Sequence, residues 1–155
     1  MAKRASSIGA GAVGGVVAGT ALSALFLLLE RQTKQPSDLV QIGRKSAALL
    51  GSPYRHGNSM PSVDEQLRYH GAHLALSALM GAAIPALRLR GVAGGALGGV
   101  GWYAVLHGLL GPRFDLVAGP FGEPAATASM RVALHAAFGI VSTAVAEALS
   151  RRDRP

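Results

Sequence analysis

Residues 8–29 read IGAGAVGGVVAGTALSALFLLL, a run of 22 residues without a charged side chain. At about 1.5 Å per residue, a helix of this length crosses the roughly 30 Å of hydrocarbon in a bilayer. Lys3 and Arg4 precede the run, as they would in a secretory signal. The run is too long for the apolar region of such a signal, and no cleavage site followed by a polar stretch occurs, so we interpret it as an uncleaved membrane anchor.

Three further apolar stretches have the length of a spanning helix, namely residues 70–87, 91–110 and 132–149. Charged residues make up 15% of the chain, well below the roughly 25% of soluble domains. We therefore predict an all-α integral membrane protein, a four-transmembrane-helix bundle that forms one domain over residues 1–155 with the lipid bilayer as its partner. The second and third spans, separated by a short turn, should form a tight antiparallel hairpin. This composition argues against a soluble enzyme, and we expect no enzymatic activity.

The chain contains no cysteine, which excludes disulfides, Cys-ligated metals and a thiol nucleophile. Its net charge of +7 would suggest nucleic acid if the basic residues formed one face. They lie instead between the apolar segments, where a membrane protein keeps them. We therefore expect no nucleic-acid partner.

The distribution of basic residues predicts the orientation. The ends on the amino-terminal side carry Lys3, Arg4, Arg88, Arg90, Arg151, Arg152 and Arg154 against one acid, Asp153. The basic residues of the other side are diluted over two long loops, 31–69 and 111–129, that also contain acids. Short, densely basic ends stay in the cytoplasm, so both termini are predicted to be cytoplasmic.

The first outer loop, 31–69, is too long to be a plain connector. Ser37 or Asp38 is placed to cap a helix, and the apolar positions that follow are interrupted by two basic residues. This pattern predicts a short helix at the membrane interface, and a helix packed over the mouth of the bundle fits it equally well. Residues 51–61 and the proline-containing loop 111–129 are predicted to form loops and turns.

Small residues recur at every fourth position in two spans. They are Gly11, Gly15 and Gly19 in the first span and Gly91, Gly95 and Gly99 in the third. In lipid, helices associate through small residues that let their backbones approach. We expect the first and third spans to meet along these faces, within a subunit or across an oligomer. The plainer explanation is that glycine is simply frequent in this chain.

The small-residue stripes lead to ionisable residues near the outer ends of the spans. Three histidines lie at four-residue steps along these stripes, the glutamate lies two turns beyond Ser23 on the stripe of the first span, and the fourth histidine lies almost one turn before the first of the three. These residues are Glu30, His70, His73, His107 and His135. Because successive spans alternate in direction, all five are expected at one level, roughly 5 Å below the outer boundary. Ionisable side chains inside a membrane are costly, so they are functional candidates by default.

Three functional interpretations of this predicted cluster stay open. All five residues could bind a divalent metal, since imidazole and carboxylate are common ligands. His73, His107 and His135 could instead hold a haem. Alternatively, the imidazoles and the carboxylate could relay protons. The plainer explanation is that the histidines only bond to loop carbonyls and to each other, and no His-Glu-x-x-His motif occurs.

The carboxy-terminal part contains Gly95-Ala96-Leu97-Gly98, then Trp102, His107 and Pro112, a proline-rich loop, His135 and a basic tail. This order resembles the bacterial YagU-like inner-membrane proteins over about 60 residues. Gly108 stands where many members carry an acid. The resemblance implies a multi-pass protein of the bacterial inner membrane.

We therefore expect a non-enzymatic membrane protein that is an oligomeric or accessory subunit of a larger complex. The alternatives are a haem- or metal-binding membrane protein and a small proton-linked transporter or channel, which would need oligomerisation because four helices with so few polar groups make a poor pathway.

Overall fold

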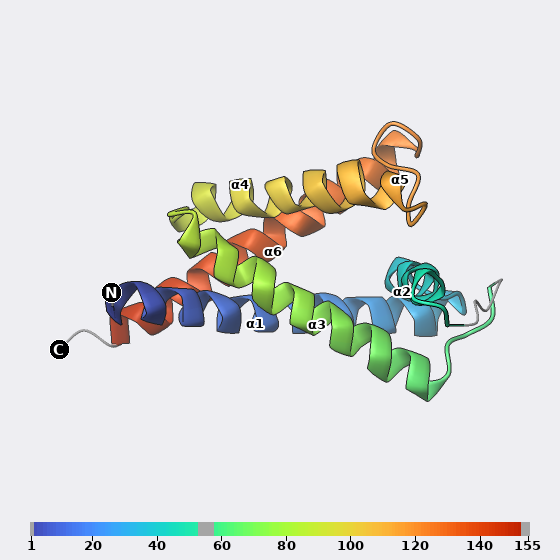
Figure 1. Cartoon of the computed structure of the whole chain (residues 1–155), viewed down its shortest axis with the longest axis horizontal. Coiled ribbons are helices and arrows are strands. Elements are labelled where there is room, and N and C mark those ends of the chain that lie inside the picture. The colour runs from blue at the N-terminus through green and yellow to red at the C-terminus, as the bar shows by residue number, and fades with distance from the viewer. Residues whose placement is uncertain (1, 53–57, 153–155) are drawn as a thin grey trace.

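The computed structural model describes residues 2–52 and 58–152. Every regular element in these ranges is a helix, which confirms the all-α class. The elements are α1 (Ala2–Thr33), α2 (Asp38–Leu49), α3 (Val63–Ala86), α4 (Gly91–Tyr103), the π-helix η1 (Ala104–Leu110), α5 (Gly111–Arg113) and α6 (Ala125–Arg152). The π-helix follows α4 without a break and leads directly into α5 (Figure 1).

Within the described ranges, three helical segments are long and apolar enough to cross a membrane: Ser7–Thr33, Gly91–Arg113 and Ala125–Arg151. They contain the predicted first, third and fourth spans and support a membrane protein. The predicted second span, 70–87, is helical within α3 but is not among these segments. Its first turns contain two histidines, which make it less apolar than the other three.

Serine caps begin α2 and α3. The side chain of Ser37 accepts a hydrogen bond from the backbone N–H of Val40 at 3.4 Å, which confirms a predicted cap of the helix in the first outer loop. Ser62 and Glu65 form a reciprocal capping box: Ser62 Oγ accepts from the Glu65 N–H at 3.3 Å, and Glu65 Oε2 accepts from the Ser62 N–H at 3.0 Å. This box begins α3 at Val63, earlier than the predicted span.

The long helices form two pairs. The helix α1 lies along α3, α4 lies along α6, and α6 also crosses to contact α1 (Figure 1). The start of α1, the α3–α4 turn and the end of α6 lie at one end of the molecule. The helix α2, the helix α5 and the loop before α6 lie at the opposite end. The two predicted outer loops are therefore on the same side.

The helices pair differently from two expectations, although a meeting of the two glycine faces across an oligomer stays a prediction. The glycine faces of the predicted first and third spans do not meet within the chain, because α1 turns its glycines toward α3 and α4 turns its glycines toward α6. The segments 70–87 and 91–110 do not form a tight hairpin either, since α3 and α4 diverge from the turn that joins them (Figure 1). A stripe of small residues marks a face that permits close approach, but it does not specify which helix fills it.

The closest approaches between helices are those of glycines to backbone carbonyl oxygens. A Cβ atom on Gly15 would lie 2.0 Å from the carbonyl oxygen of Ser77 in α3, and one on Gly99 would lie 1.9 Å from that of His135 in α6. The other glycines that a Cβ would bring within 2.6 Å of a neighbouring helix are Gly11, Gly14, Gly19, Gly43, Gly81, Gly95 and Gly139. At all of these positions except Gly19 and Gly43, the nearest atom belongs to the backbone of the neighbouring helix, so any side chain there forces the helices apart.

Gly91 does not belong to this set, contrary to the prediction. Its φ of +63° lies in the left-handed region, which favours glycine, and no described atom lies within 4 Å of its Cβ position. Its backbone N–H donates a hydrogen bond to Glu147 Oε1 in α6 at 2.7 Å. Gly91 therefore shapes the start of α4 and does not serve as a packing residue.

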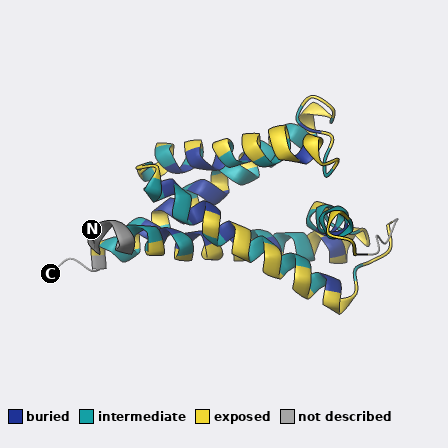
Figure 2. Ribbon diagram, in the orientation of Figure 1, coloured by how far each residue is buried: buried dark blue, intermediate teal, exposed yellow. Residues whose placement is uncertain are grey.

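A small apolar core lies where the helices cross. Ala18, Met80 and Phe138, from α1, α3 and α6, are buried together, and Leu22, Trp102 and Leu106 pack against them. Figure 2 shows the buried residues concentrated at this crossing and the exposed residues on the outward faces of α3 and α4. Exposed apolar side chains on long helices are expected where lipid is the solvent.

Candidate functional site

Tyr103, His107 and His135 form a cluster of rings between α6 and the half of the α4–η1 segment nearer the two predicted outer loops; we name it the Tyr–His cluster. The Tyr103 and His107 rings stack with their centroids 5.2 Å apart. The His135 ring meets His107 edge to face at 5.1 Å and Tyr103 at 5.5 Å. The structure thus brings two predicted site histidines together and adds Tyr103, which lies one four-residue step beyond Gly99 on the same stripe.

The π-helix begins directly after Tyr103 and contains His107. A run of seven π-helical residues is unusual, because this helix type normally occurs as single turns, often at functional sites. No alternation or motif in the sequence predicts it. The irregular backbone therefore coincides with the residues whose side chains are the strongest candidates for chemistry.

Two buried polar atoms of the Tyr–His cluster, Tyr103 Oη and His107 Nδ1, have no hydrogen-bond partner among the described residues. His135 Nδ1 donates to the backbone carbonyl oxygen of Arg131 at 2.8 Å. Because a carbonyl oxygen only accepts, this bond places the hydrogen of the neutral ring on Nδ1 and leaves a lone pair on Nε2. The cluster therefore presents a phenol and imidazole nitrogens that can bind water or exchange protons.

His73 and His70 lie on the other helix pair. His73 Nδ1 and Ser23 Oγ of α1 are hydrogen-bonded at 3.0 Å, and Phe26 meets the His73 ring edge-on with the centroids 6.3 Å apart. Ser23 lies one four-residue step beyond Gly19 in α1, so continuing the small-residue stripe leads to this contact. Both ring nitrogens of His70 are buried without a hydrogen-bond partner in the described part of the chain.

Glu30 is buried, with 2% of its surface exposed, and its carboxylate joins three helices. Its Oε1 accepts from the backbone N–H of Ser37 at 2.9 Å and also from the Ser37 hydroxyl. Its Oε2 accepts from the side-chain amide of Gln66 in α3 at 2.6 Å. Glu30 therefore holds the beginning of α2 against α1 and α3.

The five predicted metal ligands do not converge, and that prediction is wrong. In residues 2–52 and 58–152, no three His, Cys, Asp or Glu side chains are grouped so that they could hold a metal ion. The set is divided because Glu30, His70 and His73 belong to the α1–α3 pair, whereas His107 and His135 belong to the α4–α6 pair. The rings of the latter two touch at 5.1 Å, which leaves no space for a haem between them.

The sequence-based reasoning missed a set of ion pairs at the end of the molecule that holds the two predicted outer loops, which we call the outer end. Arg44 of α2 and Glu65 of α3 form a buried pair, Nε to Oε1 at 2.9 Å, with side-chain exposures of 1% and 9%. Arg131 of α6 pairs with Asp38 of α2 at 2.5 Å and with Glu123 of the second outer loop at 2.6 Å. We name α2, residues 111–124 and these ion pairs the outer cap. The ion pair between Arg131 and Asp38 joins α6 to α2, which packs against α3, and so links the α4–α6 pair to the α1–α3 pair.

A signal for these pairs exists in the sequence. Arg44 interrupts the apolar positions of a predicted interfacial helix, and Arg131 immediately precedes an apolar span. Charged residues in such places need partners. Glu65 lies 21 residues from Arg44 in the sequence, and Asp38 lies 93 residues from Arg131. Spacing alone does not identify contacts between residues so far apart in sequence.

No protein family, curated protein or solved structure matches this chain. Its function is therefore inferred from the residues and contacts described above.

Proposed function

We propose that the chain is a multi-pass protein of the bacterial inner membrane, a four-helix bundle whose spans are α1, α3, the α4–η1 segment and α6. The inclusion of α3 is supported by its pairing with α1 through glycine contacts, since a bilayer crossed by α1 would also surround α3. The resemblance to YagU-like proteins predicts the same architecture.

We propose that both termini are cytoplasmic. The α3–α4 turn, with Arg88 and Arg90, lies at the same end as the start of α1 and the end of α6 (Figure 1). The positive-inside rule favours this end as the cytoplasmic one. The last tail residues that contributed to the predicted orientation, Asp153 and Arg154, lie outside the described residues.

The proposed role is that of an oligomeric or accessory subunit of a membrane complex, without catalysis of its own. One observation carries this proposal: the segment from α4 to η1 has a second small-residue face, turned away from α6, that no described helix covers. Four of its five exposed residues are small, namely Ala93, Gly101, Ala104 and Gly108, and the fifth is Leu97; we name these five the open glycine face. No described atom lies within 4 Å of a Cβ atom built on Gly101 or Gly108.

The buried glycines of this chain illustrate what such a face does. Gly15 and Gly99 each bring a neighbouring helix backbone so close that a Cβ would collide with it. Since lipid supplies no hydrophobic force between helices, close backbone packing of this kind is what drives their association. The open glycine face therefore fits a helix of a second copy or of another membrane subunit.

Leucine substitutions test this role. Gly101→Leu and Gly108→Leu would block the open glycine face, and Gly71→Leu is the matched control because Gly71 is a helical glycine of α3 with an equally empty surrounding. In native-lipid particles, we expect wild type and Gly71→Leu to purify as an oligomer or with a stoichiometric partner, and the other two variants to purify as lone monomers of unchanged helix content. A wild-type protein that is itself a lone monomer contradicts the proposal.

The Tyr–His cluster favours a second candidate, a proton-linked transporter or channel. Its support is the buried phenol and imidazole nitrogen that lack partners among the described residues. Proteoliposomes with an internal pH dye test it: His107→Ala should abolish proton flux, and His73→Ala, on the other helix pair, should preserve it. Flux no faster than in protein-free liposomes rules this candidate out.

A further inference from the structure

A cavity of about 280 Å³ lies in the outer cap, between α2 and the loop before α6. Four charged side chains line it, two of each sign: Asp38, Lys45, Glu123 and Arg131. Apolar side chains, among them Ile42 and Val117, complete its walls. The lining therefore comes from α2, the loop before α6 and α6 itself, and its formal charges balance to zero.

The charges are separated into two poles. Arg131 is shared by the carboxylates of Asp38 and Glu123, so these three groups together carry one negative charge. The Asp38 side chain is 54% exposed, and both of its bonds to Arg131 use Oδ2. A cation in the cavity therefore has access to a carboxylate oxygen at this pole.

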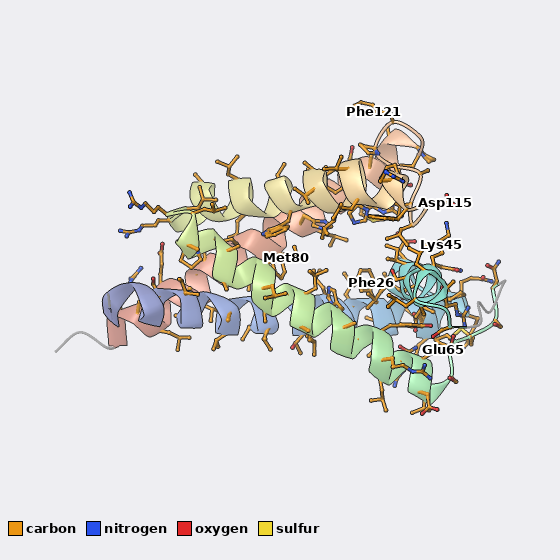
Figure 3. The ribbon with its side chains drawn as sticks, viewed as in Figure 1. Phe26, Lys45, Glu65, Met80, Asp115 and Phe121 are labelled. Carbon is orange, nitrogen blue, oxygen red and sulfur yellow. The ribbon has the colours of Figure 1, made fainter. Side chains whose placement is uncertain are left out.

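Lys45 forms the positive pole. Its ammonium group donates to the backbone carbonyl oxygen of Asp115 at 2.8 Å. Figure 3 labels the two residues, which lie near each other. A carbonyl oxygen is neutral, and no carboxylate of the described residues forms a salt bridge with Lys45. Lys45 and Asp38 lie two turns apart on the same side of α2, with their Cα atoms about 10 Å apart.

A second cavity of about 230 Å³ adjoins the first and shares Lys45 with it. Besides Lys45, its lining consists of Asp115 and three apolar residues, Ala48, Leu49 and Phe114, so its walls are mainly apolar. Phe121, which lies with Phe114 in the second predicted outer loop, is fully exposed at the edge of the molecule (Figure 3). A ligand held at Lys45 can therefore continue from a charged compartment into an apolar one.

We propose that the outer cap binds a phospholipid whose headgroup is phosphoethanolamine. The primary ammonium group lies at Asp38, the phosphate at Lys45, and the glycerol and acyl chains leave past Lys45 into the second cavity. A zwitterion matches both poles, whereas a purely anionic headgroup would meet the net negative charge around Arg131. The quaternary ammonium of choline has no N–H to donate to the Asp38 carboxylate. The apolar second cavity favours a lipid over a soluble zwitterion.

Native mass spectrometry of the purified full-length chain, titrated with phosphatidylethanolamine, phosphatidylcholine and phosphatidylglycerol of identical acyl chains, tests this site. We expect phosphatidylethanolamine to bind most tightly and Lys45→Gln to weaken it about tenfold, the value of one charge-assisted hydrogen bond. Asp38→Asn should reduce the preference over phosphatidylcholine by a similar factor. Lys34→Gln and Asp64→Asn remove the same charges from exposed positions outside the cavity and should bind like wild type.

Lys45→Gln is the decisive variant, because it leaves the ion pairs of Arg131 and Arg44 in place even if Asp38→Asn loosens the outer cap. Equal affinity for the three lipids, or wild-type affinity in Lys45→Gln, overturns the proposal. Displacement of the lipid by equimolar free phosphoethanolamine would overturn the lipid assignment in favour of a soluble zwitterion. Lipid binding at this site requires that the chain be inserted in a membrane, but not that it be a subunit of a complex. The result of the lipid titration is therefore independent of the oligomeric state found for Gly101→Leu and Gly108→Leu.

Discussion

Replacing Gly99 by alanine tests the helix packing directly. The added methyl carbon would lie 1.9 Å from the carbonyl oxygen of His135 and 2.7 Å from its carbonyl carbon. Both are backbone atoms of a helix, so neither can rotate out of the way. The two helices must then separate by about 1 Å to reach even the closest normal contact, which loosens the α4–α6 pair along its length.

The magnitude follows from comparison with Gly71→Ala, in the interior of α3, where the methyl group meets no described atom within 4 Å. Both changes gain about 1 kcal/mol of helix propensity, so this term cancels between them. Overpacking against a rigid neighbour costs about 1–3 kcal/mol, and contact with backbone atoms places Gly99→Ala at the upper end. We therefore expect Gly99→Ala to be less stable than Gly71→Ala by about 3 kcal/mol.

Unfolding in mixed micelles by added SDS measures this difference. Trp102, the single tryptophan, packs against the apolar core and reports the transition by fluorescence, with circular dichroism as a second probe. A shifted midpoint with an unchanged slope indicates a change in stability. If the two variants differ by less than about 1 kcal/mol, the close α4–α6 contact does not exist in the protein.

Two further changes probe the outer cap and the start of α4. Arg44→Met should lower the free energy of unfolding by about 3–5 kcal/mol, because it leaves the Glu65 carboxylate buried without its cation. The same SDS titration checks this, and a loss below about 1 kcal/mol would mean that the pair is solvated. Gly91→Ala should cost about 1–2 kcal/mol because its φ of +63° is unfavourable for residues with a Cβ. Gly71→Ala, which replaces a glycine inside α3, should show no such loss in the free energy of unfolding.

The helices themselves could be predicted because their signals are local. Uncharged runs and flanking basic residues located three apolar segments, and Ser37 located the start of α2. The start of α3 was predicted too late, although Ser62 and Glu65 carry the spacing of a capping box. The histidines of the second span lower its hydropathy, which is why it is not among the segments that are long and apolar enough to cross a membrane.

The partners of the helices could not be predicted in the same way. A four-residue step identifies a face of a helix, and it led correctly from Gly99 to Tyr103 and His107. The direction in which two helices diverge depends on contacts between residues far apart in sequence, such as Gly15 with Ser77. For this reason the ionisable residues near the outer end form two groups where one was expected.

Photo-crosslinking in native membranes tests the proposed subunit role most directly. The chain has no cysteine, so Gly101→Cys, Gly108→Cys and the control Gly71→Cys can each carry one thiol-linked benzophenone. The proposal predicts a discrete protein adduct, with a second copy or another subunit, from positions 101 and 108 and none from position 71. Adducts with lipid alone at positions 101 and 108, or equal protein adducts at all three positions, would contradict it.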